Sequence, residues 1–344
     1  MIMKMNNQFQ QCVHDFLMIY LPKQKCYEKN TISSYRDTLN LLRVYMDKEK
    51  SVAFHKITFG LLTYANISNF IDWLSDSRGC SASTCNQRRA CLCSFLKYAA
   101  LSDPALMNNY MNVKKVSIKK VPMESVKYLS ETALKAIFEQ PDISTVKGRR
   151  NRTLLILLYD TGARISEILN LMIDDIIINS GSPCVYLHGK GNKTRCIPIF
   201  DNTLLHLKHY LEEFHKSPKG DDPLFYTDIK GVRKSMSEDN VSIFLKKYAN
   251  EARIICHEVP EKIHCHLLRH TKAMDMYKSD IPLPYIKDFL GHSSLNTTNI
   301  YAYANLEMMR VALEPLSEDD NLLKKEDGIW KNNDDMILKL CGLK

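Results

Sequence analysis

The sequence predicts a mainly α-helical protein of two domains, with a small antiparallel β-sheet in the second domain, which is an α+β arrangement. The length of 344 residues exceeds that of a typical single domain. Apolar residues recur every three or four positions through most of the chain, which is typical of amphipathic helices. Short β-branched runs replace this period only between residues 175 and 199, so we expect strands there.

The composition excludes several classes of protein. Hydrophobic residues make up 45% of the chain and charged residues 25%, which is ordinary for a globular protein. The longest apolar run, residues 154–159, is far shorter than the roughly 20 residues of a membrane-spanning helix. The first residues are polar and lack the apolar region of a secretory signal. We therefore expect a cytoplasmic protein, neither membrane-bound nor secreted nor disordered.

Residues 1–112 are expected to form a domain of four or five helices. The segment 31–46 opens with hydroxyl residues suited to capping a helix and spaces its apolar residues three or four apart. The segments 67–74 and 81–100 follow the same rule. Arg88 and Arg89 lie on the polar side of the last of these helices.

Residues 113–128 are expected to form an extended basic linker. They contain five lysines and one glutamate, together with a proline and alternating β-branched residues. The charge before residue 129 is +9 and the charge after it is −1, which gives the net +8. Such a linker suits a polyanion. On charge alone, a solvated connection between domains is an equal alternative.

Residues 129–314 are expected to form the second domain, and residues 315–344 an acidic tail. Helices are predicted at 130–140, 152–160, 164–172, 202–214, 238–256, 266–278, 284–290 and 296–313, and strands at 175–178, 184–188 and 194–199. The last two strands are joined by a Gly/Asn-rich turn that fits a β-hairpin. Near its end, at 335–341, the tail has a short apolar segment, which we expect to be a detached docking helix.

The eleven cysteines are expected to be reduced. Their number is odd and the chain is long enough to bury a core without disulfides. The one dense group, Cys80, Cys85, Cys91 and Cys93, lacks the paired two-residue gaps of a zinc ribbon and falls in a predicted helix. Buried thiols are therefore the main interpretation, and a metal or redox role is the alternative.

Two patterns in the second domain place a basic residue beside a turn. Arg164 begins a predicted helix in Thr-Gly-Ala-Arg-Ile-Ser-Glu, where its guanidinium and the helix N–H groups favour an oxyanion such as phosphate. Lys190 lies at the tip of the Gly-Lys-Gly-Asn-Lys hairpin, where a side chain can move as a proton donor must. Taken alone, each pattern more often marks an ordinary residue: a salt-bridged or solvated arginine, or a lysine in an exposed turn.

Two further patterns supply histidines and a tyrosine. His266 and Arg269 lie three residues apart on one helix face, so they can contact one anionic group. His266 and His270 have the spacing of a zinc-protease helix, but no glutamate stands between them. His292 follows a glycine and precedes Tyr301 by nine positions. A lone tyrosine is usually a packing residue.

In this order and spacing, the four patterns resemble the tyrosine recombinase (phage integrase) family, strongly over residues 152–304 and more loosely before them. The resemblance implies a two-domain DNA clamp, with a core-site DNA-binding domain at 1–112 and a catalytic domain at 129–314. It implies a supporting role for Glu167. Carried over by motif, the implied catalytic residues are Arg164, Lys190, His266, Arg269, His292 and the nucleophile Tyr301.

The resemblance implies site-specific DNA recombination, either integration and excision or resolution, through a covalent 3′-phosphotyrosyl intermediate. A phenol titrates near 10, so Tyr301 needs a base, for which His266 is the candidate. Arg164, Arg269 and His292 would stabilise the phosphate oxygens, and Lys190 would protonate the departing 5′ oxygen. No cofactor or metal ion is expected. Because the core-binding helices begin near residue 1, we expect no separate arm-site domain and favour a simple recombinase of a mobile element or of a bacterial genome.

The implied partners are double-stranded DNA with a specific core site and three further copies of the chain, as a homo-tetramer on paired sites at the bacterial nucleoid. We expect the lysines of the linker to contact backbone phosphates, and the helical Arg88 and Arg89 to contact bases. These linker lysines are Lys114, Lys115, Lys119 and Lys120. The segment near 336–340 is expected to dock on a neighbouring protomer; packing on its own domain is the alternative.

Two rival functions remain at this point. A type IB topoisomerase uses similar chemistry, but the motif order and the small helical first domain favour recombination. A DNA-binding regulator without enzymatic activity is the second rival, and the intact Arg164, His266, Arg269 and Tyr301 argue against it.

Overall fold

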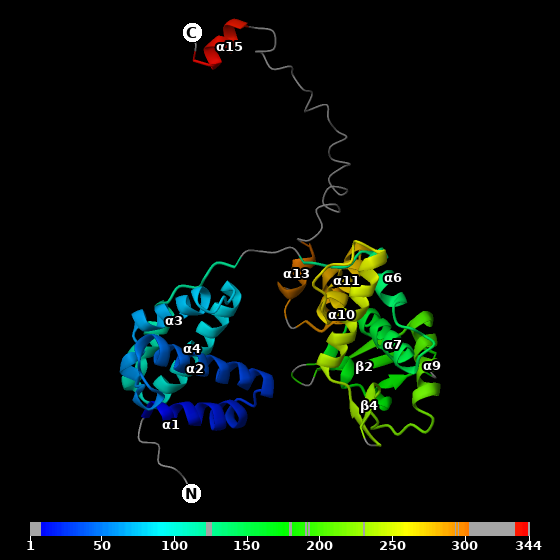
Figure 1. Ribbon diagram of the computed structural model, residues 1–344, viewed down its shortest axis with the longest axis horizontal. Coiled ribbons are helices and arrows are strands. Elements are labelled where there is room, and N and C mark those ends of the chain that lie inside the picture. Colours follow the sequence, from blue (N-terminus) through cyan, green and yellow to red (C-terminus); the bar gives the residue numbers. More distant parts are fainter. Residues whose placement is uncertain are drawn as a thin grey trace. The chain divides into compact units, whose positions relative to one another are not determined.

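The structure is a computed structural model, shown in Figure 1, and it forms two compact units, Met1–Met123 and Glu124–Lys344. The division falls inside the segment predicted to be a linker. The residues described are 8–121, 126–178, 181–189, 191, 193–229, 231–292, 294, 296–302 and 334–342.

The first unit is a helical bundle, as predicted. Its helices are α1 (Gln8–Asp15), the π-helix η1 (Phe16–Gln24), α2 (Lys29–Lys50), α3 (Tyr64–Asp76), α4 (Ala82–Ser102) and α5 (Met107–Lys115), with short 3-10 turns η2 (Phe54–Lys56), η3 (Phe59–Leu61) and η4 (Pro104–Leu106). Helices α2, α3 and α4 correspond to the three predicted ones and extend beyond them. Sequence patterns did not indicate α1, η1 or α5, and Pro22 inside η1 is itself a signal against a helix.

Capping and aromatic packing explain why the first unit folds as it does. The hydroxyls of Thr63 and Ser81 accept hydrogen bonds from backbone N–H groups of the first turns of α3 and α4. Phe16 packs edge-on against Phe95 with ring centroids 5.3 Å apart, and both rings are fully buried. Cys85 and Cys91 are free thiols buried in this unit.

The second unit combines helices with two small antiparallel sheets. The helices are α6 (Glu131–Glu139), α7 (Val146–Asp160), α8 (Ile165–Leu169), the 3-10 turn η5 (Ile173–Asp175), α9 (Asp201–Phe214), α10 (Glu238–Ile255), α11 (Cys265–Lys278), α12 (Leu283–Leu290), α13 (Asn296–Ala302) and α15 (Asp334–Leu340). The strands are β1 (Ile176–Ile177), β2 (Cys184–Gly189) and β3 (Lys193–Pro198) in one sheet, and β4 (Tyr226–Ile229) and β5 (Val232–Ser235) in another.

The predicted hairpin is present, with Gly189 paired to Lys193 across its turn. Three details differ from the prediction. Helix α8 is shorter than 164–172 because the chain after Leu169 leaves the helix to pair Met172 with Pro223. Strand β1 has two residues because a 3-10 turn occupies the residues before it. The β4–β5 hairpin was not expected. The predicted helix 296–313 is described only as far as Ala302.

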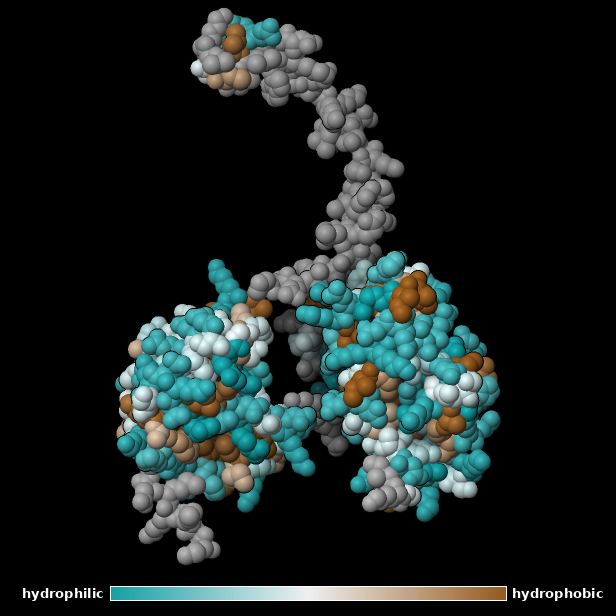
Figure 2. Space-filling view, in the orientation of Figure 1, coloured by the Kyte–Doolittle hydropathy of each residue, from teal (hydrophilic) through white to brown (hydrophobic). Residues whose placement is uncertain are grey.

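The core of the second unit joins its helices to its larger sheet. Leu154, Leu155, Leu157 and Leu158 of α7 are all fully buried, so the second half of this helix presents a broad apolar face to the core. A separate cluster of buried residues joins α11, α12 and α13 and includes Tyr301. In Figure 2 the visible surface of both units is mostly hydrophilic, as expected when apolar side chains fill the cores. Among the described residues, no helix is long and apolar enough to cross a membrane.

Two leucines of α4 test the packing of the first unit. Leu96 is 1% exposed and Leu101 is 69% exposed. We expect Leu96→Ala to lower the free energy of unfolding by about 2–5 kcal/mol, because it leaves a cavity in the core. Leu101→Ala, the matched control, should change it by less than about 0.5 kcal/mol. Urea unfolding followed by the fluorescence of Trp73, in a Trp330→Phe background, measures both; equal losses would contradict the packing described here.

Candidate active site

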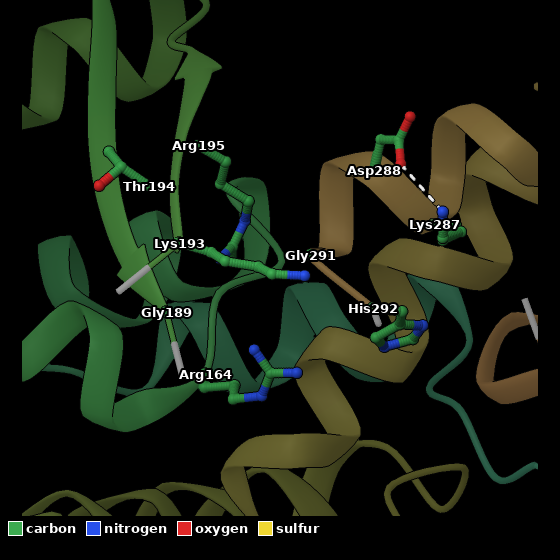
Figure 3. Close-up of a pocket in the computed structure, with 9 residues that line it drawn as sticks. All are labelled: Arg164, Gly189, Lys193, Thr194, Arg195, Lys287, Asp288, Gly291 and His292. Carbon is green, nitrogen blue, oxygen red and sulfur yellow. Dashed lines mark ion pairs between the residues drawn. The ribbon is translucent and has the colours of Figure 1, made fainter. Parts of the chain in front are cut away.

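A cavity of about 490 Å³ opens between the β2–β3 hairpin and α12 in the second unit. Figure 3 shows its lining: Arg164, Gly189, Lys193, Thr194, Arg195, Lys287, Asp288, Gly291 and His292. The lining contains four basic side chains of lysine and arginine and a single carboxylate. Such a surface favours an anion of the size of a phosphodiester.

Arg164 is held at the N-terminus of α8 by Glu167. The Arg164 backbone N–H donates to Glu167 Oε2 at 2.8 Å, and its Nη1 donates to Oε1 at 2.9 Å. The preceding Gly162 has a φ of +55°, a conformation that glycine adopts readily. This turn sends the chain into α8 with the Arg164 side chain beside the cavity, as Figure 3 shows.

Glu167 is a buried carboxylate between two arginines. Arg195 binds it with Nη1 at 3.0 Å from Oε1 and Nη2 at 2.7 Å from Oε2. Burial by itself raises the pKa of this carboxyl, but the hydrogen bonds from Arg195 and Arg164 and their charges outweigh burial and hold the pKa at about 2. Glu167 is therefore ionised at neutral pH and fixes both guanidinium groups.

Arg195 is a residue of this site that sequence patterns missed. It lies on the inward face of β3, opposite the buried Leu187, and its Nε donates to the Phe289 carbonyl at 2.9 Å. It thus joins β3, α8 and the end of α12. Gly291 has a φ of +66°, where a side chain is strained, and a Cβ there would lie 3.0 Å from Arg195 Nη1. The only signal in the sequence was a charged residue at an inward-facing strand position.

Arg269 is not part of the cavity lining and is only 3% exposed. Its Nη1 donates to the Gly162 carbonyl and its Nη2 to the Leu290 carbonyl, both at 2.6 Å. Burial, together with the nearby charge of Arg164, lowers its pKa to about 10, so it remains cationic at neutral pH. Arg269 therefore connects α11 to the turn before Arg164 and to the end of α12 before His292.

His292 follows the Gly291 turn and lies at the cavity, where its Nδ1 is 3.0 Å from Thr298 Oγ1 of α13. Burial, reinforced by the charges of Arg269 and Arg164, lowers its pKa to about 4. The imidazole is therefore neutral at pH 7 and acts through hydrogen bonds.

Tyr301 is fully buried and is not part of the cavity lining. Its hydroxyl lies 2.9 Å from His270 Nδ1, and burial raises its pKa to about 12, against the opposing charge of Arg269. His266, predicted to be its base, lies one helical turn from His270, with ring centroids 6.5 Å apart. Burial, with the charge of Arg269, lowers the pKa of His266. The role of His266 as the base stays a prediction.

The predicted hairpin lysine, Lys190, lies outside the described residues. Lys193, at the other end of the same turn, is a cavity residue that the sequence analysis did not select. In Figure 3 its side chain extends from the hairpin into the space that the other lining residues surround. Of the predicted catalytic residues, the structure thus places Arg164, Arg269 and His292 near one another. Tyr301 is bonded to His270, and His270 lies one helical turn from His266.

Arg88 and Arg89, predicted to contact bases, bind groups of their own domain. Arg88 Nη1 donates to the Ser34 carbonyl at 2.9 Å, which ties α4 to α2. Arg89 donates to the carbonyls of Val116 and Lys114 at 2.6 and 2.8 Å, which fixes the start of the predicted linker. These bonds occupy part of both guanidinium groups, and base contact stays a prediction.

The predicted linker lysines differ in their surroundings. Lys114 and Lys115 are exposed in the last turn of α5, so the linker is not extended from residue 113 as predicted. Lys119 forms an ion pair with Asp72 at 3.0 Å, and Lys120 is exposed. The exposed lysines are the ones available to an external anion.

Comparisons with known proteins agree with this site. The model named Phage integrase family matches residues 127–308, and the model named Phage integrase SAM-like domain matches residues 13–119. The chain is 31% identical to a putative integrase/recombinase, y4rC, of Sinorhizobium fredii over 90% of its own length and 95% of that protein. It is 27% identical to the tyrosine recombinase XerC of Staphylococcus carnosus over 87% and 94% of the two chains.

A solved structure agrees in fold. A lambda integrase tetramer bound to a Holliday junction matches with a TM-score of 0.63 at 16% identity, over 85% of this chain and 76% of that one. The chain therefore belongs to the phage integrase family of tyrosine recombinases, enzymes of DNA strand breakage and rejoining. The fold class and family predicted from the sequence are both confirmed.

Glu167 makes the stability of the second unit depend on pH. Its folded-state pKa of about 2 lies below the ordinary value of 4.5. Its stabilisation is therefore complete above pH 4.5 and is lost as the pH falls toward 2. We expect Glu167→Gln to lower the free energy of unfolding by about 3 kcal/mol at pH 7, and by progressively less from pH 5 to pH 3.

Glu213→Gln is the matched control for this measurement. Glu213 also forms a bidentate pair, with Arg149, but both side chains are about one-third exposed. We expect this variant to lose less than about 1 kcal/mol. Chemical denaturation across the pH range measures both variants, and a loss for Glu167→Gln that does not change with pH would contradict the buried network.

Proposed function

We propose that this protein recombines DNA at a specific site through a phosphotyrosyl intermediate, and that its task is integration and excision, or resolution, for a mobile element. The observation that carries the proposal is the basic cavity, which Arg164 and His292 both line, with the buried Arg269 bonded to the chain just before each of them. A cavity of this kind accommodates one phosphodiester of the DNA backbone.

In the proposed reaction, the Tyr301 oxygen attacks the phosphorus, and the bond from phosphorus to the 5′ oxygen breaks. His266 takes the phenol proton, and Lys190 supplies the proton for the departing 5′ oxygen. Arg164 and His292 bind the non-bridging oxygens, and the charge of Arg269 stabilises the negative charge that develops there. Attack by a second strand's 5′ hydroxyl reverses these steps and releases Tyr301.

The basic side chains of the cavity would stabilise the ionised Tyr301 phenol as well as the phosphate. In its buried position Tyr301 has a pKa of about 12, so its ionisation at neutral pH is unfavourable. Beside Arg164 and the other guanidinium groups, the phenolate would be stabilised and its pKa lowered. Movement of Tyr301 to the cavity therefore supplies both position and activation.

We propose that each segment of the chain has the function that the sequence suggested. Residues 1–112 would bind the core site, 113–128 would link the domains along DNA, 129–314 would carry the chemistry, and 315–344 would form the tail. Helix α15 presents Met336 and Leu338 at 38% and 37% exposure, which suits docking on a neighbouring protomer. Four protomers on paired DNA sites in the cytoplasm, at the bacterial nucleoid, complete the proposal.

Trapping of the covalent intermediate tests the chemistry. A nicked suicide duplex that carries the flanking sequence of the protein's own gene loses the 5′ hydroxyl needed for rejoining. We expect the wild-type protein to form an SDS-stable adduct and Tyr301→Phe to form none. The control Tyr285→Phe, at an exposed position of α12, should retain the adduct. An adduct formed by Tyr301→Phe would identify another nucleophile, with Tyr303 the next to test.

The salt dependence of DNA binding tests the linker. Replacing Lys115 and Lys120 together by alanine should reduce the slope of log K against log salt by about 1.8, since each phosphate contact releases about 0.9 counterion. Lys48→Ala with Lys50→Ala removes the same charge from the end of α2 and should leave the slope unchanged. Fluorescence anisotropy over a salt series measures both, and an unchanged slope for the linker variant would refute phosphate contacts there.

A further inference from the structure

Tyr301 occupies a position from which it cannot react. Its side chain is 0% exposed and packs among Ala273 and Met274 of α11 and Ile286 and Leu290 of α12. The cavity that would hold the phosphate is lined by other residues. A phosphodiester at the protein surface has no access to a side chain without exposed area, so α13 must move before Tyr301 can reach it.

His270 provides the polar contact that holds the phenol in this position. A buried hydroxyl requires a hydrogen-bond partner, and His270 Nδ1, at 2.9 Å, is the partner found. Burial, with the neighbouring His266, lowers the pKa of His270 to about 4, and burial raises that of Tyr301 to about 12. At neutral pH the bond therefore joins two neutral groups, and no ion pair must be broken to release the phenol.

The described part of α13, Asn296–Ala302, is held by side-chain contacts to α11 and to the turn after α12. Two of its side chains, Thr298 and Tyr301, are fully buried, and each is bonded to a histidine: Thr298 to His292 at 3.0 Å and Tyr301 to His270. Movement of α13 would therefore free Tyr301 and His292 together.

We propose that His270 is a positioning residue that retains Tyr301, and with it α13, in a buried state from which the tyrosine is released for cleavage. The inference rests on the proposed function only in treating Tyr301 as the nucleophile. It makes two separate statements: His270 stabilises the buried position of α13, and His270 is not required for the chemical step.

Hydrogen exchange in the DNA-free full-length protein tests the first statement. Mass spectrometry of the peptide covering 296–302 would be compared for wild type, His270→Phe, Tyr301→Phe and the double variant. Loss of one hydrogen bond should speed exchange in each single variant by about 2- to 12-fold. Because both changes remove the same bond, the double variant should exchange no faster than the faster single variant. Unchanged exchange, or additive effects, would overturn the inference.

Two further variants keep this measurement decisive. His257→Phe makes the same substitution at an exposed histidine after α10 and should leave exchange in α13 unchanged. His270→Gln keeps a polar group able to bond the phenol and should exchange close to wild type. If His270→Phe does not fold, the other two variants are compared. Slow exchange in His270→Gln together with fast exchange in Tyr301→Phe would support retention of α13 by this hydrogen bond. Fast exchange in His270→Gln with slow exchange in Tyr301→Phe would overturn it.

Adduct formation on the suicide duplex tests the second statement. We expect His270→Phe to form the covalent adduct at least as fast as wild type, because the retained state is weakened. Loss of the adduct in this variant, with the wild-type adduct present, would overturn the inference and identify His270 as a proton acceptor. Since exchange is measured without DNA, absence of any wild-type adduct would refute the proposed function and leave the retention of α13 to be judged separately.

Discussion

The site depends on the buried carboxylate of Glu167. It forms a bidentate pair with Arg195, and it accepts hydrogen bonds from both the backbone and the side chain of Arg164. A site that binds phosphate must gather cations, and these repel one another at short range, so a nearby negative charge is needed to offset the repulsion. A buried carboxylate does this at the cost of its own desolvation, which the two guanidinium groups offset. It leaves Arg164 directed at the cavity while Arg195 secures the strand and the end of α12.

Arg269 has a complementary function. Where Glu167 fixes guanidinium groups by charge, Arg269 fixes backbone by donating to the carbonyls of Gly162 and Leu290. These carbonyls precede Arg164 and His292 by only two residues each, so one buried side chain sets the positions of two others. The site is thus assembled from α8, β3, α11 and the α12 turn by contacts between residues up to 107 positions apart in the chain.

Helix α11 also connects the basic cavity to the buried Tyr301. Arg269 contacts the cavity loops, and the next residue, His270, contacts Tyr301. Val126 and Tyr128, which end the basic linker, pack against the cluster that contains Tyr301, and the Leu129 N–H donates to Thr271 of α11 at 3.0 Å. The segment predicted to follow DNA therefore meets the helix that packs against Tyr301, the proposed nucleophile.

The sequence by itself determined the helical class, the β2–β3 hairpin and the family, because apolar period, turn residues and ordered short motifs are all local properties. It also selected Arg164, Arg269 and His292, which the structure places near one another, and their catalytic roles stay a prediction. Tertiary structure alone decided that Arg195 completes the site, that His270 and not His266 bonds Tyr301, and that Arg88 and Arg89 bind their own domain. These are contacts between distant segments, and a single sequence without its fold does not record which donor meets which acceptor. Tertiary structure also decided that Tyr301 is buried, because its burial depends on packing by α11 and α12 that no local pattern encodes.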